Sequence, residues 1–558
     1  MMRKTTRTLS ALAALALCLF ATAPLLRAET PETEAPVEKT VDQKINDFFK
    51  PATETVNKVV FAPIYTSPDK NEDGSPQWKV PFILIWLGGG AVFLTFYFRF
   101  VNLRAFGLAL RTVRGKYSTS SDPGEITHFQ ALASAVSGTV GLGNIAGVAI
   151  GIMLGGPGVA FWLFLSGFLG MATKFAECTL GVKYREITPE GHIHGGAMYY
   201  LTKGFAERGL APVGKVLAIL FAIFCVFASF GGGNVFQVNQ ATSQLINVTG
   251  GDGSFFAGRQ WLFGTLLAVI TGLVIIGGIR GIAKVTARLV PAMCLVYVLS
   301  ALVVLFPQRR PHPRRHLDDL HRGVPTARRD HRWRARRLHL GHAPRHLLQR
   351  SGHRFRPHRP LGRANPHARL GRHRRPARTV PRHGHRLHHD SLVLVTSMYF
   401  NGDGGDFTIN GQHFTLGDSS NTSTAFGISM TSMAFETVHG GFQYVLFVCV
   451  LLFAFSTLIT WSYYGLQAWQ YLFGRNKAVD LLYKVIFCLV IIAGSSASMG
   501  NAVDFSDASL FAMSIPNLIG VYFLLPVIHR EVKKFIRFTR LVDGGKSIKD
   551  ASAEVGAE

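Results

Sequence analysis

Long apolar stretches recur along this chain and set the strongest limit on its fold. Nine of them approach or exceed the roughly 20 residues that an α-helix needs to cross the hydrocarbon core of a bilayer. Charged residues make up 16% of the 558 residues, against about 25% in soluble domains. The pattern predicts an all-α polytopic membrane protein. The predicted spans are 81–99, 127–155, 157–178, 215–236, 261–279, 288–306, 443–471, 483–499 and 508–528.

The positive charge of the chain is concentrated in one segment. The formal net charge is +26, and residues 309–390 contribute +20 of it through 24 Arg and 4 Asp. The same segment holds 15 of the 21 His. The remaining chain is only mildly basic, so the total charge does not identify a nucleic-acid binder, and we expect no nucleic-acid partner.

Basic and acidic loops alternate between the predicted spans and predict their orientation. Because cytoplasmic loops carry the excess of Lys and Arg, we expect a bacterial inner-membrane protein with a cytoplasmic C-terminus. The same rule would place the Arg-rich segment outside, which is the wrong side for it. The basic clusters lie at 104–116, 183–185, 280–288, 475–484 and 529–537, and the acidic residues of the other loops are Asp252, Asp403, Asp406, Asp504 and Asp507.

The Arg-rich segment has the composition that out-of-frame reading of a GC-rich gene typically gives. For 346–391, codons exist whose frame, shifted by one base, reads as apolar membrane sequence, contains the Gly-rich run SNEAGIGS and rejoins the written sequence at Leu392. We therefore interpret 307–390 as a frameshift that replaces two spans. The alternative is a genuine basic insert that binds anionic lipid or nucleic acid.

The segments of the chain follow from these features. A basic start, an apolar run and a possible cleavage after Ala28 predict a signal peptide or targeting segment. The predicted order is 1–28 targeting segment, 29–79 periplasmic polar segment, 80–306 first half of a transporter domain, 307–390 anomalous segment, 391–540 second half and 541–558 cytoplasmic tail.

Two restored spans would give eleven in total, of which about nine are intact as written. Without the first, ten remain as two sets of five, and the first span of each set carries a Gly-rich interruption. Broken helices at corresponding positions of two halves are typical of inverted-repeat secondary transporters. We therefore expect an inverted-repeat (5+5) core with one extra N-terminal span.

The interruption in the first half is the run SGTVGLGNIAG at 137–147. Each glycine there costs helix stability of roughly 1 kcal/mol, and unwound backbone is tolerated at membrane depth only where it lines a cavity or is buried in protein. Freed carbonyls can coordinate Na⁺, and the N–H groups of a half-helix can bind a substrate carboxylate. Close packing of small residues between helices is the alternative.

Polar residues in two other spans are candidates for the same site. Gln237 follows the run Gly231–Asn234, which we expect to close the span at 215–236, and an outer loop cap is an equal alternative for Asn239 and Gln240. Hydroxyls at Ser456, Thr457 and Thr460 suit Na⁺ as hard oxygen ligands, although hydroxyls also bond back to their own helix.

Other reactive residue types give no enzyme signature. Lys174 and Glu177 are expected to form an interfacial ion pair. The six Cys all lie in apolar runs, as packing residues do. We find no catalytic constellation, and we expect no enzyme activity, no metal other than Na⁺ and no cofactor.

The chain resembles a known family in several motifs. HFQALASAVSGTVGLGNIAGVAIGI (128–152), GGPGVAFW (155–162), ATKFAECTLGVKYRE (172–186), GGAMYYL (195–201) and TWSYYG (460–465) look like the alanine/glycine:cation symporters, also called sodium:alanine symporters. The resemblance implies import of alanine or glycine with Na⁺ or H⁺. It implies substrate contacts by Thr139, Val140, Gly141, Gly143, Asn144, Gln237 and Trp461, and Na⁺ binding by Ser137, Ser456, Thr457 and Thr460.

Two functions remain open from the sequence. The first is a symporter of a small neutral amino acid coupled to Na⁺ or H⁺, embedded in the lipid bilayer and of unknown oligomeric state. The second is a membrane-embedded binding or signalling protein whose basic segment recruits anionic partners. Because the written chain lacks two expected spans, we expect it to be misfolded or inactive as it stands.

Overall fold

The structure is a computed structural model that describes residues 57–69, 79–118, 125–189, 192–305, 399–401, 406–409, 412–415, 427–497 and 499–556. These residues all belong to one compact unit, Ile45–Glu558. The predicted targeting segment 1–28, most of 29–79 and the anomalous segment 307–390 lie outside the described residues.

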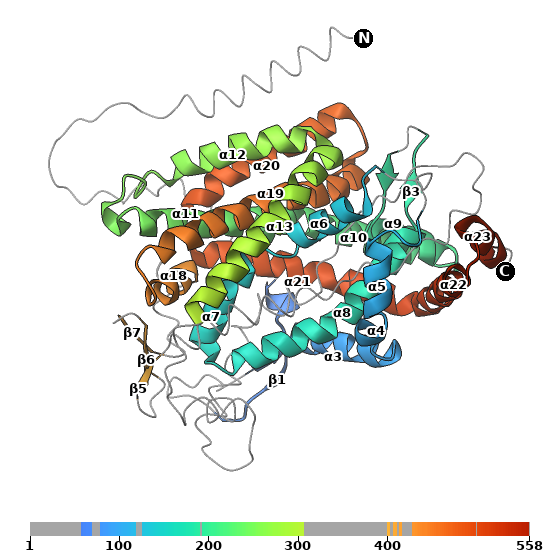
Figure 1. Cartoon of the computed structure of the whole chain (residues 1–558), viewed down its shortest axis with the longest axis horizontal. Helices are drawn as coiled ribbons and strands as arrows, with labels where there is room; N and C mark the ends of the chain where they lie inside the picture. Colours follow the sequence, from blue (N-terminus) through green and yellow to red (C-terminus); the bar gives the residue numbers. More distant parts are fainter. Residues whose placement is uncertain are drawn as a thin grey trace, which may run out of the picture. The chain divides into compact units, whose positions relative to one another are not determined.

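Each predicted span contains helix in the structure (Figure 1). The corresponding helices are α3 (Phe82–Tyr97), α6 (His128–Ser137) with α7 (Ala146–Gly155), α8 (Val159–Lys183), α10 (Ala211–Phe230), α12 (Gln260–Ile276), α13 (Gly278–Leu305), α19 (Phe442–Phe473), α20 (Lys477–Ser496) and α21 (Met499–Phe523). The remaining helices are α4 (Val101–Arg104), α5 (Phe106–Val113), α9 (Ala197–Ala206), α11 (Phe236–Val248), α18 (Ile428–Glu436), α22 (Leu525–Asp543) and α23 (Ile548–Gly556), with short turns at η1 (Leu142–Asn144), η2 (Gly231–Val235) and η3 (Gly251–Gly253).

Strands are few and short among the described residues. Three antiparallel sheets are formed by β1 (Pro63–Thr66) with β2 (Lys79–Pro81), by β3 (Glu186–Ile187) with β4 (Ile193–His194), and by β5 (Tyr399–Asn401), β6 (Asp406–Ile409) and β7 (Gln412–Thr415) in that order. The first sheet precedes α3 and the other two lie in connections between helices, so the fold is mostly helical, as predicted.

Candidate membrane spans are identified by the length and apolar composition of each helix. Five helices of the described residues are long and apolar enough to cross a membrane, and two bent pairs would each add one. Two further apolar helices, α3 and α12, have 16 and 17 residues. The nine apolar segments of the sequence thus all appear, while the two proposed for 307–390 fall outside the described residues.

Three predicted boundaries were wrong. The basic cluster at 280–288 is not a loop, because α13 begins at Gly278 and only a tight turn with φ +61° at that glycine separates it from α12. The span at 215–236 does not close at Gly231–Asn234 but continues through the π-helical turn η2 into α11. The last span bends by 65° between α21 and α22, before the expected end at 528.

The interruption predicted in the second span is present. Thr127 and Gln130 form a reciprocal capping box that starts α6. The helix ends at Ser137, the short turn η1 follows, and α7 resumes at Ala146, with a bend of 63° between the two parts. The Gly-rich run therefore lies where the helix is broken.

Helix α19 is the central element of the described part of the chain. It packs against α6, α10, α11, α12, α13, α18 and α20, and Trp461 in its middle is completely buried. The broken helix and the η2 turn both contact it. Side chains of α19 can therefore reach two irregular segments at once.

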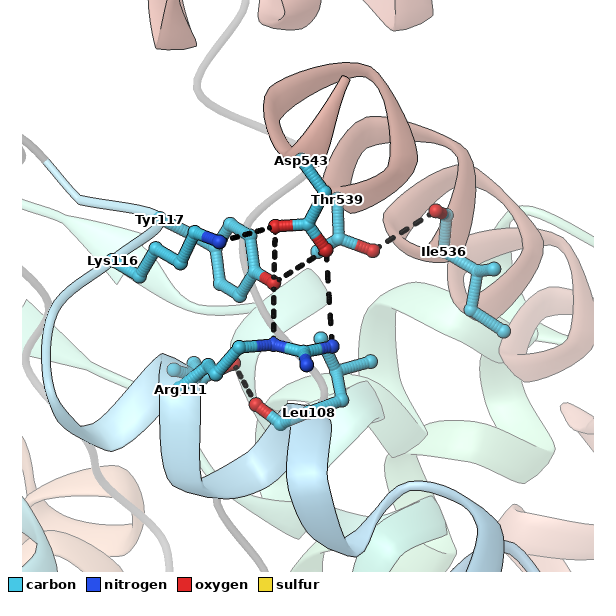
Figure 2. A network of polar contacts seen from close by, with 8 residues as sticks. Leu108, Arg111, Lys116, Tyr117, Ile536, Thr539 and Asp543 are labelled. Carbon is cyan, nitrogen blue, oxygen red and sulfur yellow. Dashed lines mark hydrogen bonds and ion pairs between the residues drawn. The ribbon is translucent and has the colours of Figure 1, made fainter. Parts of the chain in front are cut away.

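An ion cluster fastens the α5 region to the C-terminal end of α22 (Figure 2). The Asp543 carboxylate lies 2.8 Å from Lys116 Nζ and 3.7 Å from Arg111 Nη2, and it accepts a hydrogen bond of 3.0 Å from the Tyr117 hydroxyl. Hydrogen bonding by Lys116 is the largest cause that lowers the pKa of Asp543. We call Arg111, Lys116, Tyr117 and Asp543 the α5–α22 clamp.

Candidate functional site in the broken helix

The four residues expected to bind Na⁺ come together where α6 ends against α19. Ser137 Oγ donates to the Ser456 carbonyl. Thr460 Oγ1 donates to Ser137 Oγ over 2.8 Å, and Thr457 Oγ1 lies 3.3 Å from the Ser137 carbonyl oxygen. Each of the four is at most 1% exposed. We call Ser137, Ser456, Thr457 and Thr460 the hydroxyl cluster.

The hydroxyl cluster is compact and carries no formal charge. A hydroxyl has one proton and two lone pairs, so Ser137 Oγ, which donates once and accepts once, keeps one lone pair. Thr457 Oγ1 also lies 2.8 Å from the Phe453 carbonyl of its own helix. Backbone and hydroxyl oxygens from two helices thus converge in one buried spot.

Trp461 joins the break to α19 at the next position. Its indole Nε1 donates to the Gly138 carbonyl over 3.0 Å. This carbonyl belongs to the residue after the last of α6. A buried unpaired carbonyl costs free energy, so this hydrogen bond stabilises the break between α6 and α7. The indole ring also packs against the break.

The η2 turn approaches the same indole from another side. A Cβ added at Gly233 would lie 2.5 Å from Trp461 Cβ and Cγ, and one added at Gly138 would lie 2.8 Å from Thr460 Cγ2. Neither position has room for a larger side chain. This close approach explains why glycine occupies both positions.

Gln237 bridges the two irregular segments. Its Oε1 accepts from the Leu142 N–H over 2.9 Å, and its Nε2 donates to the Gly232 carbonyl over 2.8 Å. The side chain is completely buried. A residue at the start of α11 therefore binds η1 of the broken helix and η2 of its own helix together.

The remaining candidates occupy the break itself. Thr139, Val140 and Asn144 are each at most 4% exposed. The Thr139 hydroxyl donates back to α6, to the carbonyls of Ala135 or Val136 at 3.1 Å. Gly141 is extended, and Gly143 lies inside η1. All eleven candidate residues thus lie in one region built from the α6–α7 break, the start of α11 and α19.

Two further amides on α11 hold the helix α18: Gln240, for which the sequence left an outer loop cap as an equal alternative, and Gln244, which the sequence analysis did not consider. Gln240 Oε1 accepts from the Ile428 N–H at 3.3 Å, and Gln244 Nε2 donates to Ser432 Oγ at 3.0 Å. Gln237, Gln240 and Gln244 recur at helical spacing, which was visible in the sequence. The partner helix α18 was not predicted, so their role in holding it was not visible.

The expected ion pair of Lys174 and Glu177 is present, and it is buried within the protein. Lys174 Nζ lies 2.9 Å from Glu177 Oε2, and the two side chains are 9% and 2% exposed. Asn517 donates to the other carboxylate oxygen, and the Tyr200 hydroxyl donates to Asn517. This chain of contacts ties α8 and α9 to α21, which is a packing role.

A small cavity lies beside the hydroxyl cluster. It measures about 10 Å³ and is lined by Thr460 with Ser134, Tyr463 and Tyr464. This is about the space that one water requires. The region is therefore closely packed in the described conformation.

A family profile matches most of this chain. The profile of the "Sodium:alanine symporter family" matches residues 71–312 and 408–547. The chain belongs to this family. Its members are transporters and not enzymes, and this chain is accordingly a multi-pass membrane protein of cation-coupled amino-acid transport, from a family whose name gives sodium as the coupling ion.

Two curated relatives and one solved structure are similar to this chain over most of its length. The sodium/alanine symporter AgcS of Methanococcus maripaludis is 34% identical over 457 residues, which cover 82% of this chain and 94% of that protein. The probable sodium/glutamine symporter GlnT of Bacillus subtilis is 26% identical over 82% of this chain and 88% of that protein. A crystal structure of MhsT in complex with L-phenylalanine is 16% identical, with a TM-score of 0.46 over 78% of this chain and 92% of that one.

Proposed function

We propose that this protein imports alanine or glycine together with Na⁺ or H⁺. The observation that carries the proposal is the hydroxyl cluster, in which the end of a broken helix meets α19 through Ser137 and Thr460. Buried oxygens from hydroxyls and freed carbonyls are the ligands that a hard cation prefers. The relatives alone leave the substrate open, because one is named for alanine and another for glutamine.

The absence of formal charge among these four residues supports coupling. A Na⁺ ion bound there would leave an uncompensated positive charge in a buried place, which is costly. A substrate carboxylate placed nearby would neutralise it, so each would bind more tightly in the presence of the other. We assign the carboxylate to the N–H groups of the break at Gly141 and Gly143, with the Asn144 side chain beside them, because the Asn144 N–H itself donates to the Gly141 carbonyl.

The remaining candidates would complete the substrate pocket. Gln237 would orient the break through its bond to the Leu142 N–H. Trp461 would limit the space for the substrate side chain, because its indole is pinned between Gly138 and Gly233. A wall of this kind favours a small side chain such as that of alanine or glycine.

The arrangement of the chain forms the second part of the proposal. We propose eleven spans with a 5+5 inverted-repeat core in a bacterial inner membrane and a cytoplasmic C-terminus. The family match stops at 312 and resumes at 408. This interruption supports the interpretation of 307–390 as a shifted frame that replaces two spans and the second broken helix.

The test is uptake of labelled alanine by vesicles that contain the chain with its frame restored across 307–390. We expect uptake driven by an inward Na⁺ gradient, abolished when Na⁺ is replaced by K⁺, and competition by glycine. Uptake that follows a proton gradient and ignores Na⁺ would assign H⁺ as the coupling ion. No uptake of alanine or glycine under either gradient would contradict the proposal.

A further inference from the structure

A second polar site lies at the far end of α19, away from the hydroxyl cluster. A cavity of about 230 Å³ is lined by Glu186, Tyr199, Lys203, Gln470, Tyr471 and Arg475. These residues come from β3, from α9 and from the end of α19 with the turn that follows. We call this cavity the α9–α19 pocket. Ten residues of helix separate Thr460 from Gln470, which is roughly 15 Å along the axis.

The pocket carries two cations and one anion among these six residues. Glu186 lies 2.9 Å from Arg475 Nη2 and 3.1 Å from Lys203 Nζ. The Arg475 Nη2 also donates to the Tyr199 hydroxyl over 2.8 Å. Arg has five N–H donors and Lys has three, so both keep donors beyond those that Glu186 and Tyr199 accept. The excess positive charge favours a ligand with a carboxylate.

Gln470 supplies a hydrogen-bond acceptor to the pocket, whereas Arg475 and Lys203 supply donors. Its Nε2 donates to Asp480 Oδ1 over 2.7 Å, while its buried Oε1 accepts from no group in the described part of the chain. The carboxylate of Asp480 can only accept, which fixes the amide orientation. The residue is 9% exposed. A buried acceptor of this kind calls for a donor, and an ammonium group is a strong one.

The size and shape of the α9–α19 pocket further limit which ligands it can bind. The volume is below the range of about 300–1,000 Å³ that drug-sized ligands occupy. The rings of Tyr199 and Tyr471 meet edge to face at 5.9 Å and give the cavity an apolar wall. A carboxylate, an ammonium and a small apolar part together describe a free α-amino acid.

We propose that the α9–α19 pocket binds a free α-amino acid, with its carboxylate on Arg475 and Lys203 and its ammonium on Gln470. By the charge distribution this end of α19 faces the cytoplasm, so the ligand would come from the product side. A ligand there would link α9 to α19, the helix that carries Thr460, and would slow import as product accumulates. This regulatory consequence rests on the proposed import function, whereas the binding itself does not.

The test is equilibrium binding of labelled alanine to the full-length chain, as written and with its frame restored, with and without Na⁺. We expect a Na⁺-independent component that weakens at high ionic strength, since charges that are 36–39% exposed are screened by salt. Arg475→Gln and Lys203→Gln should each weaken this component by roughly tenfold, from the loss of a charged hydrogen bond. Lys477→Gln is the matched control, because Lys477 is exposed and does not line the pocket.

Two analogues of alanine test separately whether the pocket recognises the ammonium and the carboxylate. Lactate replaces the ammonium by a hydroxyl and ethylamine lacks the carboxylate, so both should compete at least tenfold more weakly than alanine. Equal competition by lactate would overturn the amino-acid assignment. A lack of Na⁺-independent binding in both chains, or unchanged binding in both pocket variants, would overturn the site. Loss of the Na⁺-dependent component alone would count against the proposed transport function and leave the pocket standing.

Discussion

The hydroxyl cluster and the α9–α19 pocket both include residues of α19, but only the pocket contains charged side chains. The hydroxyl cluster is uncharged and at most 1% exposed, whereas Glu186, Lys203 and Arg475 are 36–39% exposed. Burying ions without compensation is costly, so the proposed central site would use neutral oxygens and leave the charge to its ligands. The pocket keeps its own ions where water still reaches them.

The two sites also depend on different parts of the chain. The described residues of the pocket lie in β3, α9 and α19, all of which are present as written. The proposed central site would need a second broken helix, which the frameshift interpretation assigns to the anomalous segment. The comparison therefore separates a pocket whose residues are all written from a site that this interpretation leaves half built.

The largest expected effect comes from the reading frame. We expect the written chain to show no Na⁺-driven uptake of alanine, because the frameshift interpretation leaves it without two spans and half of the central site. We expect the frame-restored chain to transport. If the written chain folds, it should keep Na⁺-independent alanine binding at the pocket. Uptake in vesicles and binding to purified protein measure the two sites separately, and transport by the written chain would refute the frameshift interpretation.

The next effect tests the close packing around Trp461. Gly233→Ala places a Cβ 2.5 Å from Trp461 Cβ and Cγ, and overpacking of this kind costs about 1–3 kcal/mol. We expect a lower melting temperature and impaired Na⁺-dependent uptake in the frame-restored chain, with pocket binding intact in the protein that remains folded. Gly88→Ala on α3 is the control, since nothing lies within 4 Å of its added Cβ.

A smaller change tests the hydroxyl cluster directly. Thr460→Val keeps the shape of the side chain but removes the hydrogen bond of 2.8 Å to Ser137 Oγ. The apparent affinity for Na⁺ in uptake should fall by roughly fivefold to tenfold, as expected from about 1–1.4 kcal/mol for one lost polar contact. Ser462→Ala is the control, because that hydroxyl donates to Ile459 in its own helix. Equal Na⁺ affinities in the two variants would remove Thr460 from the site.

How far the sequence predicted these sites depends on the range of the interactions. The apolar runs and the break at 137–147 were predicted correctly, because span length and glycine content act locally. The continuation through Gly231–Asn234 was not, since it depends on Trp461 and Ser506, which lie far along the chain and contact those glycines. The pocket was missed for the same reason: Glu186 and Arg475 are 289 residues apart.

The smallest effect concerns the α5–α22 clamp, a third arrangement of charge that lies in neither site (Figure 2). Asp543→Asn removes the ion pairs with Lys116 and Arg111, whose side chains are 48–49% exposed. Exposed pairs contribute about 0–1 kcal/mol, so the melting temperature should fall slightly and uptake should stay unchanged.

The effect of Asp543 on stability should depend on pH. Because the folded-state pKa of Asp543 is lowered, its contribution to the free energy of unfolding is present above the unfolded pKa of about 3.9 and is lost as pH falls through the folded value. The difference in melting temperature between the parent chain and Asp543→Asn should therefore shrink in acid below about pH 4 and with added salt. A difference that persisted in acid and high salt would mean that Asp543 acts through packing and not through its charge.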